Sequence, residues 1–179
     1  TTALTLDSDS TDDSILHLTT DDASPDDEIE CEATATDSDG AVATGSDTVE
    51  IDNTAPTVDS VTISYEGDAV TTSSTLTCAA TASDADGETP TLTYAWSHAS
   101  GDALGDGSDT LTLTPDSSAP GDVITCTVMA QDAHGGMATG SADVTITNTA
   151  PVFSLAAAIT PDTNVRTSTA LVCHAEATD

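Results

Sequence analysis

The chain repeats its own sequence with a period of 95 residues. The segment 24–56 aligns without a gap on 119–151, and seventeen of the 33 paired positions are identical. The four cysteines obey the same shift in two pairs, Cys31 with Cys126 and Cys78 with Cys173. A fixed period of this length indicates an array of one folded unit. Because such arrays are extended and quasi-one-dimensional, the repeat favours a structural role over catalysis.

The period divides the 179 residues into one complete unit and two partial ones. We predict the C-terminal part of a repeat at 1–53, a complete repeat at 54–148, and the N-terminal strands of the next repeat at 149–179. The sequence has no initiator methionine and no signal peptide, so we interpret it as a piece of a longer secreted protein. The apolar run 152–159 is too short to span a bilayer, so no membrane insertion is expected in this segment.

The charge balance excludes two classes of partner. There are 32 acidic residues, one base (Arg166) and a net charge of −31. Such a charge argues against binding nucleic acid or an anionic membrane surface. Dissolved salt, bound cations or both must screen the carboxylates. Low hydrophobicity with high charge also fits disorder, but the alternating apolar pattern and the paired cysteines favour a folded chain.

Short segments that alternate apolar and polar residues predict half-buried strands. In the complete repeat we expect strands at 58–65, 74–82, 91–97, 109–114, 122–130 and 142–147. Clusters of Asp, Gly, Pro and Ser separate these strands, and no segment has convincing helical periodicity. Many short strands with this spacing predict an all-β fold, specifically a β-sandwich.

The cysteines are expected to brace a thin core. Aromatic residues make up 2% of the chain, so Val, Ile, Leu and Ala must fill the interior. A small domain with few large side chains gains from a covalent staple. Two buried free thiols are the alternative. The Lys-free, Thr-rich composition is typical of exported proteins, in which disulfides persist, so we favour a bridge.

The order Cys78, Trp96, Cys126 resembles that of immunoglobulin-like (Ig-like) domains. The junction N-T-A-P at 53–56 and the turn S-D-A-D-G at 83–87 are similar to those of the tandem bacterial Ig-like repeats of large secreted surface proteins. The resemblance implies tandem Ig-like β-sandwich domains in a linear array. It also implies one disulfide per domain, between the second and fifth of these strands (B and F of the Ig-like fold, here Cys78 and Cys126), with Trp96 packed on it in the core. Ile124 replaces the tyrosine of antibody-type domains, which argues against that subclass.

At the same spacing, Cys31 and Cys173 must find partners outside the chain. In one explanation the chain is a window on a longer covalent array, and flanking repeats supply the partners. In the other, residues 149–179 of one copy complete residues 1–53 of the next by strand exchange. Both give a head-to-tail line that does not close. Neither end supplies the counterpart of residues 85–95, which favours the window.

Acidic residues gather in the loops that an Ig-like sandwich brings to one end. The linker before the repeat and two loops supply six predicted ligands: Glu50, Asp52, Asn53, Asp84, Asp86 and Asp132. This number is close to the six to eight oxygens that Ca²⁺ binds, and hard oxygens suit Ca²⁺ better than a transition metal. Weaker ligands are predicted at Asp37, Asp39, Asn148 and Asp179. The arrangement is similar to cadherin repeats, in which acidic linkers bind Ca²⁺ and stiffen a rod. The alternative is solvated turns, because D-x-D-G is a good turn sequence whatever it binds.

No catalytic arrangement stands out in the sequence. It has no H-x-x-x-H pair, no G-x-S-x-G elbow, no phosphate loop and no C-x-x-C, so we do not expect an enzyme. The predicted function is a structural component of an extracellular fibre or filament at the cell surface. Its partners would be copies of itself or flanking repeats. The alternatives are an adhesin stalk, or a sugar- or protein-binding module appended to a secreted protein.

Overall fold

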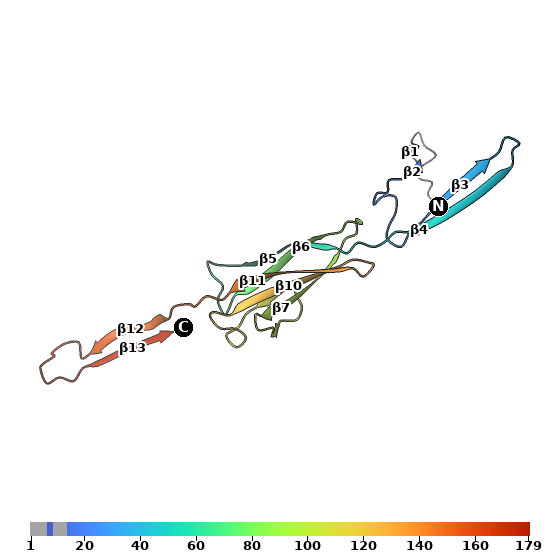
Figure 1. Ribbon diagram of the computed structural model, residues 1–179. Coiled ribbons are helices and arrows are strands. Elements are labelled where there is room, and N and C mark those ends of the chain that lie inside the picture. The colour runs from blue at the N-terminus through green and yellow to red at the C-terminus, as the bar shows by residue number, and fades with distance from the viewer. Residues whose placement is uncertain (1–6, 9–13) are drawn as a thin grey trace.

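The computed structural model describes residues 7–8 and 14–179 (Figure 1). These residues form strands, turns and loops, and none of them lies in a helix. Residues 1–6 and 9–13 belong to the predicted partial repeat 1–53 and lie outside the described part of the chain. Two short strands at its start, β1 (Asp7–Ser8) and β2 (Ser14–Ile15), pair with each other.

Residues 57–145 form two sheets that face each other. The first sheet has the order β5–β6–β9, with β5 (Thr57–Tyr65), β6 (Thr75–Ser83) and β9 (Thr110–Thr112). The second has the order β11–β10–β7–β8, with β11 (Met137–Thr145), β10 (Val123–Gln131), β7 (Thr91–His98) and β8 (Ala103–Leu104). Every neighbouring pair is antiparallel. These are the strand neighbours of an Ig-like sandwich, as the sequence predicts.

Two strands differ from the prediction, while the others agree to within two residues. β11 begins at Met137, not at 142. Met137 pairs with Gln131, the last residue of β10, so β11 pairs with β10 along its whole length. The segment containing β8 was expected to be a turn. Instead it pairs briefly with β7, with Leu104 opposite Trp96.

The core lies between the sheets, and the disulfide crosses it. Cys78 of β6 and Cys126 of β10 are bonded with an S–S distance of 2.03 Å, which is the predicted B–F bridge. Trp96 is buried on β7, and its Nε1–H donates to the carbonyl of Ser108 at 3.0 Å. The other buried apolar residues of this cluster are Val70, Leu76, Leu111, Leu113, Ile124, Val128 and Ile146.

Gly140 of β11 sets how closely β5 approaches the second sheet. A Cβ atom there would lie 2.7 Å from Val58 Cγ1 and 3.1 Å from Val61 Cγ2. Gly45, its counterpart one period earlier, has no heavy atom within 4 Å of the same position. We expect Gly140→Ala to lower the free energy of unfolding by about 1–3 kcal/mol, because overpacking forces the sheets apart.

The matched control for this prediction is Gly45→Ala. It should leave the free energy of unfolding unchanged or raise it by less than about 1 kcal/mol, because it only restricts the unfolded chain. Urea denaturation of the two variants and the wild type measures both effects. Equal losses of stability in the two variants would contradict the close packing at Gly140.

Two hairpins flank the sandwich at opposite ends of the molecule (Figure 1). β3 (Glu28–Thr36) pairs with β4 (Val42–Glu50), and β12 (Val152–Thr160) pairs with β13 (Val172–Thr178). Their bounds follow the period of 95, because β3, β4 and β12 match β10, β11 and β5 at both ends. In the described residues no second sheet covers either hairpin, and nearly all of their side chains are exposed.

The turns of the hairpins also follow the period. Asp132 Oδ1 accepts hydrogen bonds from the backbone N–H groups two and four residues later, at 2.9 and 2.7 Å. In the β3–β4 turn, Asp37 Oδ1 accepts the equivalent bonds at 2.9 and 2.8 Å. The repeat is therefore present in the local hydrogen bonding of the described residues as well as in the sequence.

Candidate functional site

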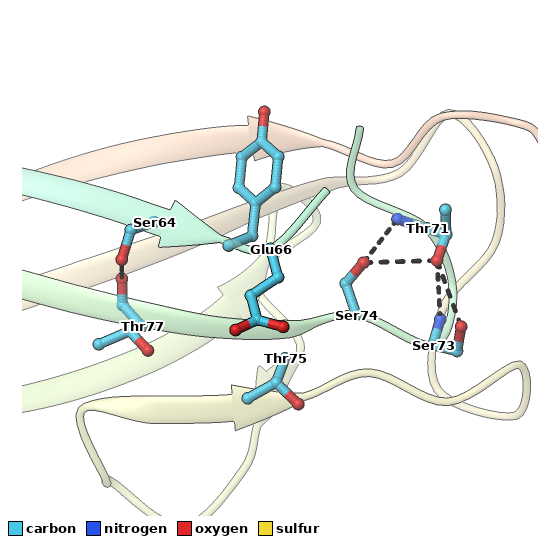
Figure 2. A pocket seen from close by; sticks show the side chains of 8 residues that line it. Ser64, Glu66, Thr71, Ser73, Ser74, Thr75 and Thr77 are labelled. Carbon is cyan, nitrogen blue, oxygen red and sulfur yellow. Dashed lines mark hydrogen bonds between the residues drawn. The ribbon is translucent and has the colours of Figure 1, made fainter. Parts of the chain in front are cut away.

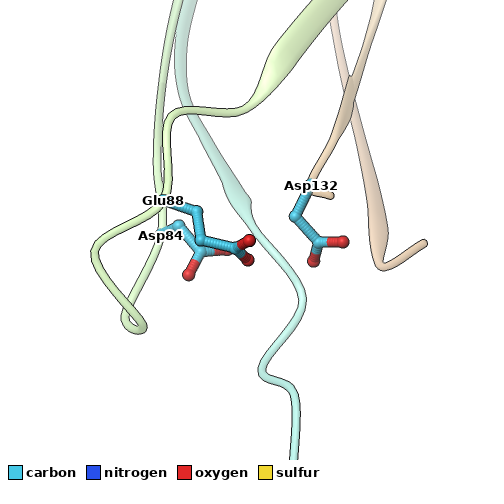
Figure 3. Close-up of side chains that lie close together, drawn as sticks. All are labelled: Asp84, Glu88 and Asp132. Atoms are coloured by element: carbon cyan, nitrogen blue, oxygen red, sulfur yellow. The ribbon is translucent and has the colours of Figure 1, made fainter. Parts of the chain in front are cut away.

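Acidic side chains from two loops meet where the chain enters the sandwich. Figure 3 shows Asp84 and Glu88, from the loop between β6 and β7, directed toward Asp132, which begins the turn between β10 and β11. One oxygen of each carboxylate lies within 4.8 Å of the other two. The loops meet because β6 and β10 end on the same side of the sandwich. Three carboxylates at this separation repel one another unless a positive charge lies between them.

The linker 51–56 adds Asn53 to this group of residues. Asn53 Nδ2 donates a hydrogen bond to Asp132 Oδ2 at 3.0 Å. Among the described residues, three buried side-chain atoms have no hydrogen-bond partner: Asn53 Oδ1, Asp84 Oδ2 and Glu88 Oε2. All three are acceptor oxygens of this site. A buried unpaired acceptor costs about 1–3 kcal/mol, and a cation that takes oxygen ligands can satisfy several at once.

Asp86 holds the linker against the loop. Its Oδ2 accepts a hydrogen bond from the backbone N–H of Thr54 at 2.7 Å. Asp84 Oδ1 in turn accepts the backbone N–H of Asp86 at 2.7 Å, which shapes the D-x-D-G turn. Asp84 therefore uses one oxygen for the turn and leaves the other available for a ligand.

Asp132 is 7% exposed and is held in its ionised form. The side-chain hydrogen bond from Asn53 has the largest effect on its pKa and lowers it. Backbone N–H groups of Gly136, His134 and Gly135 lower it further, against the raising effect of burial, so the pKa lies below its ordinary value. The site therefore keeps this negative charge at neutral and mildly acidic pH.

The segment before β3 touches the same loops. His134 Nδ1 lies 3.0 Å from Glu88 Oε1, and His134 Nε2 lies 3.5 Å from Asp26 Oδ2. A Cβ atom at Gly87 would lie 3.3 Å from Thr20 Cβ. The acidic site thus lies at a junction, where the sandwich meets the part of the chain that precedes it.

A family model described as the bacterial Ig domain matches residues 53–147. The chain belongs to the bacterial Ig domain family. Domains of this family are typically structural or binding modules of extracellular and surface proteins, and not enzymes. Neither the curated proteins nor the solved structures include a match to the chain. The described residues also include no helix that is long and apolar enough to cross a membrane.

The Ig domain brings together three of the six predicted ligands, Asn53, Asp84 and Asp132. Glu50 and Asp52 are exposed and lie outside the cluster. Successive side chains of an extended segment point in opposite directions, so a linker that turns Asn53 inward turns Asp52 outward. Glu50 ends β4, opposite Glu28.

Glu88 is the candidate ligand that the sequence reasoning missed. It stands four residues after Asp84 in the same loop, in the segment D-A-D-G-E. An acidic residue directly after the glycine of a D-x-D-G turn is the signal that could have found it. The turn reverses the chain, and that reversal brings Glu88 back toward Asp84.

The weaker predicted ligands lie apart from this cluster, and all four are exposed. Asp37 and Asp39 belong to the β3–β4 turn, where Asp37 accepts the backbone N–H of Asp39. Asn148 and Asp179 correspond to Asn53 and Asp84 at a shift of 95. Among the described residues, a group of three metal-ligating side chains within mutual reach is found only at Asp84, Glu88 and Asp132.

A concave region of the Ig domain lies beside the β5–β6 loop, away from the acidic cluster (Figure 2). Its volume is about 600 Å³, and its lining is Ser64, Tyr65, Glu66, Thr71, Ser73, Ser74, Thr75 and Thr77. Several of these hydroxyls bond within their own loop, as when Ser74 Oγ accepts the N–H of Thr71 at 2.9 Å. Tyr65, which is 40% exposed, is the aromatic side chain of this lining.

Proposed function

We propose that the chain is a segment of an extracellular rod or filament, built from Ig domains in a linear array. The observation that carries this proposal is the recurrence of strands and turns at a shift of 95 on both sides of the complete domain. The β3–β4 hairpin has the pattern of the last two strands of a domain. The β12–β13 hairpin has the pattern of the first two. Both hairpins therefore support an array that is built from one unit.

The exposed hairpins support the proposal on energetic grounds. Ile124, Cys126 and Val128 of β10 are fully buried, whereas their counterparts in β3 are largely exposed. An isolated two-stranded hairpin is marginally stable in water, so each hairpin needs a second sheet. Neighbouring strands of the same array would supply that sheet.

We further propose that a Ca²⁺ ion stiffens the junction. Asp84, Glu88 and Asp132 would supply carboxylate oxygens, Asn53 would supply its amide oxygen, and water would complete the six to eight ligands that Ca²⁺ takes. These residues belong to the linker and to both loops. A cation bound by the linker, the β6–β7 loop and the β10–β11 turn together would restrict bending of the linker. It would also offset the repulsion between carboxylates that have no Lys or Arg nearby.

Electron micrographs of the native assembly test the rod directly. A strand of nine residues, such as β5, spans about 31 Å, so each domain with its linker should add about 40 Å. We expect unbranched fibres with an axial repeat near that length. The fibres should be straight in Ca²⁺ and more curved after chelation. Compact isolated particles in the native material would contradict the proposal.

A further inference from the structure

Gly136, in the turn between β10 and β11, lies directly against the linker that precedes the Ig domain. A Cβ atom at Gly136 would lie 2.9 Å from Ala55 Cα and 3.0 Å from Asn53 Nδ2. It would also collide with Asp132 Oδ2, which accepts the hydrogen bond from Asn53. Ala55 Cα belongs to the backbone, so it cannot rotate away from an added side chain. The linker can therefore occupy this place only because residue 136 has no side chain.

The backbone conformation of the turn does not itself require a glycine at position 136. The positive φ angle of this turn falls on the preceding residue, Gly135, at 93°. Gly136 lies outside the left-handed region, so its φ angle is one that alanine adopts without strain. The physical reason for a glycine at position 136 is therefore the close approach of the linker, and not the shape of the turn.

The β3–β4 turn, one period earlier in the chain, separates these two roles of glycine. Gly40 corresponds to Gly135 and also has a positive φ angle, at 85°. The residue that corresponds to Gly136 is Ala41. Asp37 Oδ1 nevertheless accepts the backbone N–H of Ala41 at 2.8 Å, as Asp132 Oδ1 accepts that of Gly136 at 2.7 Å. The turn thus accepts alanine at this position, and what glycine adds there is room for the linker.

We propose that Gly136 is the positioning residue of the junction, because it admits the linker to the acidic site. With the linker in this place, Asn53 reaches Asp132, and its own buried Oδ1 remains available as a ligand. This inference rests on the proposed Ca²⁺ junction, because it names the residue that lets the linker supply a ligand. A repeat with alanine at this position, such as the one that contains Ala41, would leave its own linker outside the site. An array would then contain junctions with the ion and junctions without it.

Amide hydrogen exchange of the calcium-free protein tests the placement of the linker without the ion. The Thr54 N–H donates to Asp86 Oδ2 at 2.7 Å, so its exchange reports whether the linker lies on the loop. We expect Gly136→Ala to speed exchange at Thr54 by roughly tenfold, because overpacking displaces the linker. The His134 N–H, which Asp132 Oδ1 accepts at 2.9 Å, should exchange at the wild-type rate because the turn remains intact. Unchanged exchange at Thr54, or faster exchange at His134, would overturn the proposal.

The matched control is Ala41→Gly, which makes the reverse exchange at the corresponding position one period earlier. It changes the same pair of residue types in a turn with the same hydrogen bonds to its aspartate. Exchange at Thr54 should stay within about twofold of the wild type, because Ala41 belongs to a different turn. Equal acceleration in Gly136→Ala and Ala41→Gly would show a general effect of these substitutions and would also overturn the proposal.

Titration of calcium into the same three proteins connects the linker to the proposed ion. Gly136→Ala should bind calcium roughly tenfold more weakly than the wild type, because Asn53 is displaced as a ligand and as a partner of Asp132. Ala41→Gly should bind it as the wild type does. Wild-type affinity in Gly136→Ala would overturn this inference and retain the calcium junction. If the wild type binds no calcium while Gly136→Ala still frees Thr54, the ion is rejected and the positioning role of Gly136 is supported.

Discussion

Replacing both bridge cysteines, as Cys78→Ala with Cys126→Ala, is expected to lower the free energy of unfolding of the Ig domain by about 4 kcal/mol. The bridge closes a loop of 48 residues, and opening it returns that entropy to the unfolded chain. The loss is large relative to the total, because small domains are stable by only about 5–15 kcal/mol. The sandwich also has few large side chains besides Trp96 to compensate.

Two comparisons isolate the contribution of the bridge. Reduction of the wild type opens the bond without deleting atoms, so it should reproduce most of the loss measured for the double variant. Cys31→Ser with Cys173→Ser removes the two exposed thiols and should change the stability of the monomer by less than about 0.5 kcal/mol. Urea denaturation measures all four proteins. A loss below about 1 kcal/mol on opening the bridge would show that apolar packing alone holds the sheets together.

Much of the fold could be predicted because the hydrophobic pattern of each strand repeats. The alternation along β10 is regular, and every second residue is buried. β11 was misjudged because it contains Gly140, which in a sequence indicates a turn or an end. In the structure that glycine lies inside the strand, where it lets Val58 approach. A close contact between two sheets leaves no periodic signal in the sequence. The sequence alone therefore could not distinguish a glycine that ends a strand from a glycine that lies inside a strand and allows close packing.

The candidate site could be predicted at the level of its loops but not of all its side chains. Ig-like topology brings the linker and both loops to one end, which is why Asn53, Asp84 and Asp132 could be named together. The direction of each linker side chain depends on particular hydrogen bonds, such as that from Thr54 to Asp86. The sequence does not specify these bonds. It therefore could not separate Asn53 from its exposed neighbour Asp52.

Calcium is expected to raise the stability of the junction by about 4 kcal/mol when its free concentration is a thousand times the dissociation constant. The physical reason is that the folded loops hold three carboxylates together, with buried oxygens that lack partners, and the unfolded chain does not. Asp84→Asn combined with Glu88→Gln keeps the shape of both ligands and removes two of the charges. We expect this double variant to lose most of the response in a thermal scan.

Calcium would also stabilise an acidic chain by general screening of its carboxylates, without a specific site. The control must therefore remove two negative charges from positions outside the cluster. Glu50→Gln combined with Asp52→Asn does this, because both residues are exposed and lie outside the cluster. Its response to calcium should match that of the wild type. If the two double variants lose the response equally, calcium acts through net charge and not through a site.

Calorimetric titration of calcium into these three proteins, at moderate salt, tests the junction most directly. The account predicts one site per complete Ig domain, with a dissociation constant below about 1 mM. That site should be present in the wild type and in the Glu50→Gln, Asp52→Asn control. It should be absent from the Asp84→Asn, Glu88→Gln variant. No binding tighter than about 1 mM in the wild type, or the same isotherm in all three proteins, would contradict a calcium-stiffened junction.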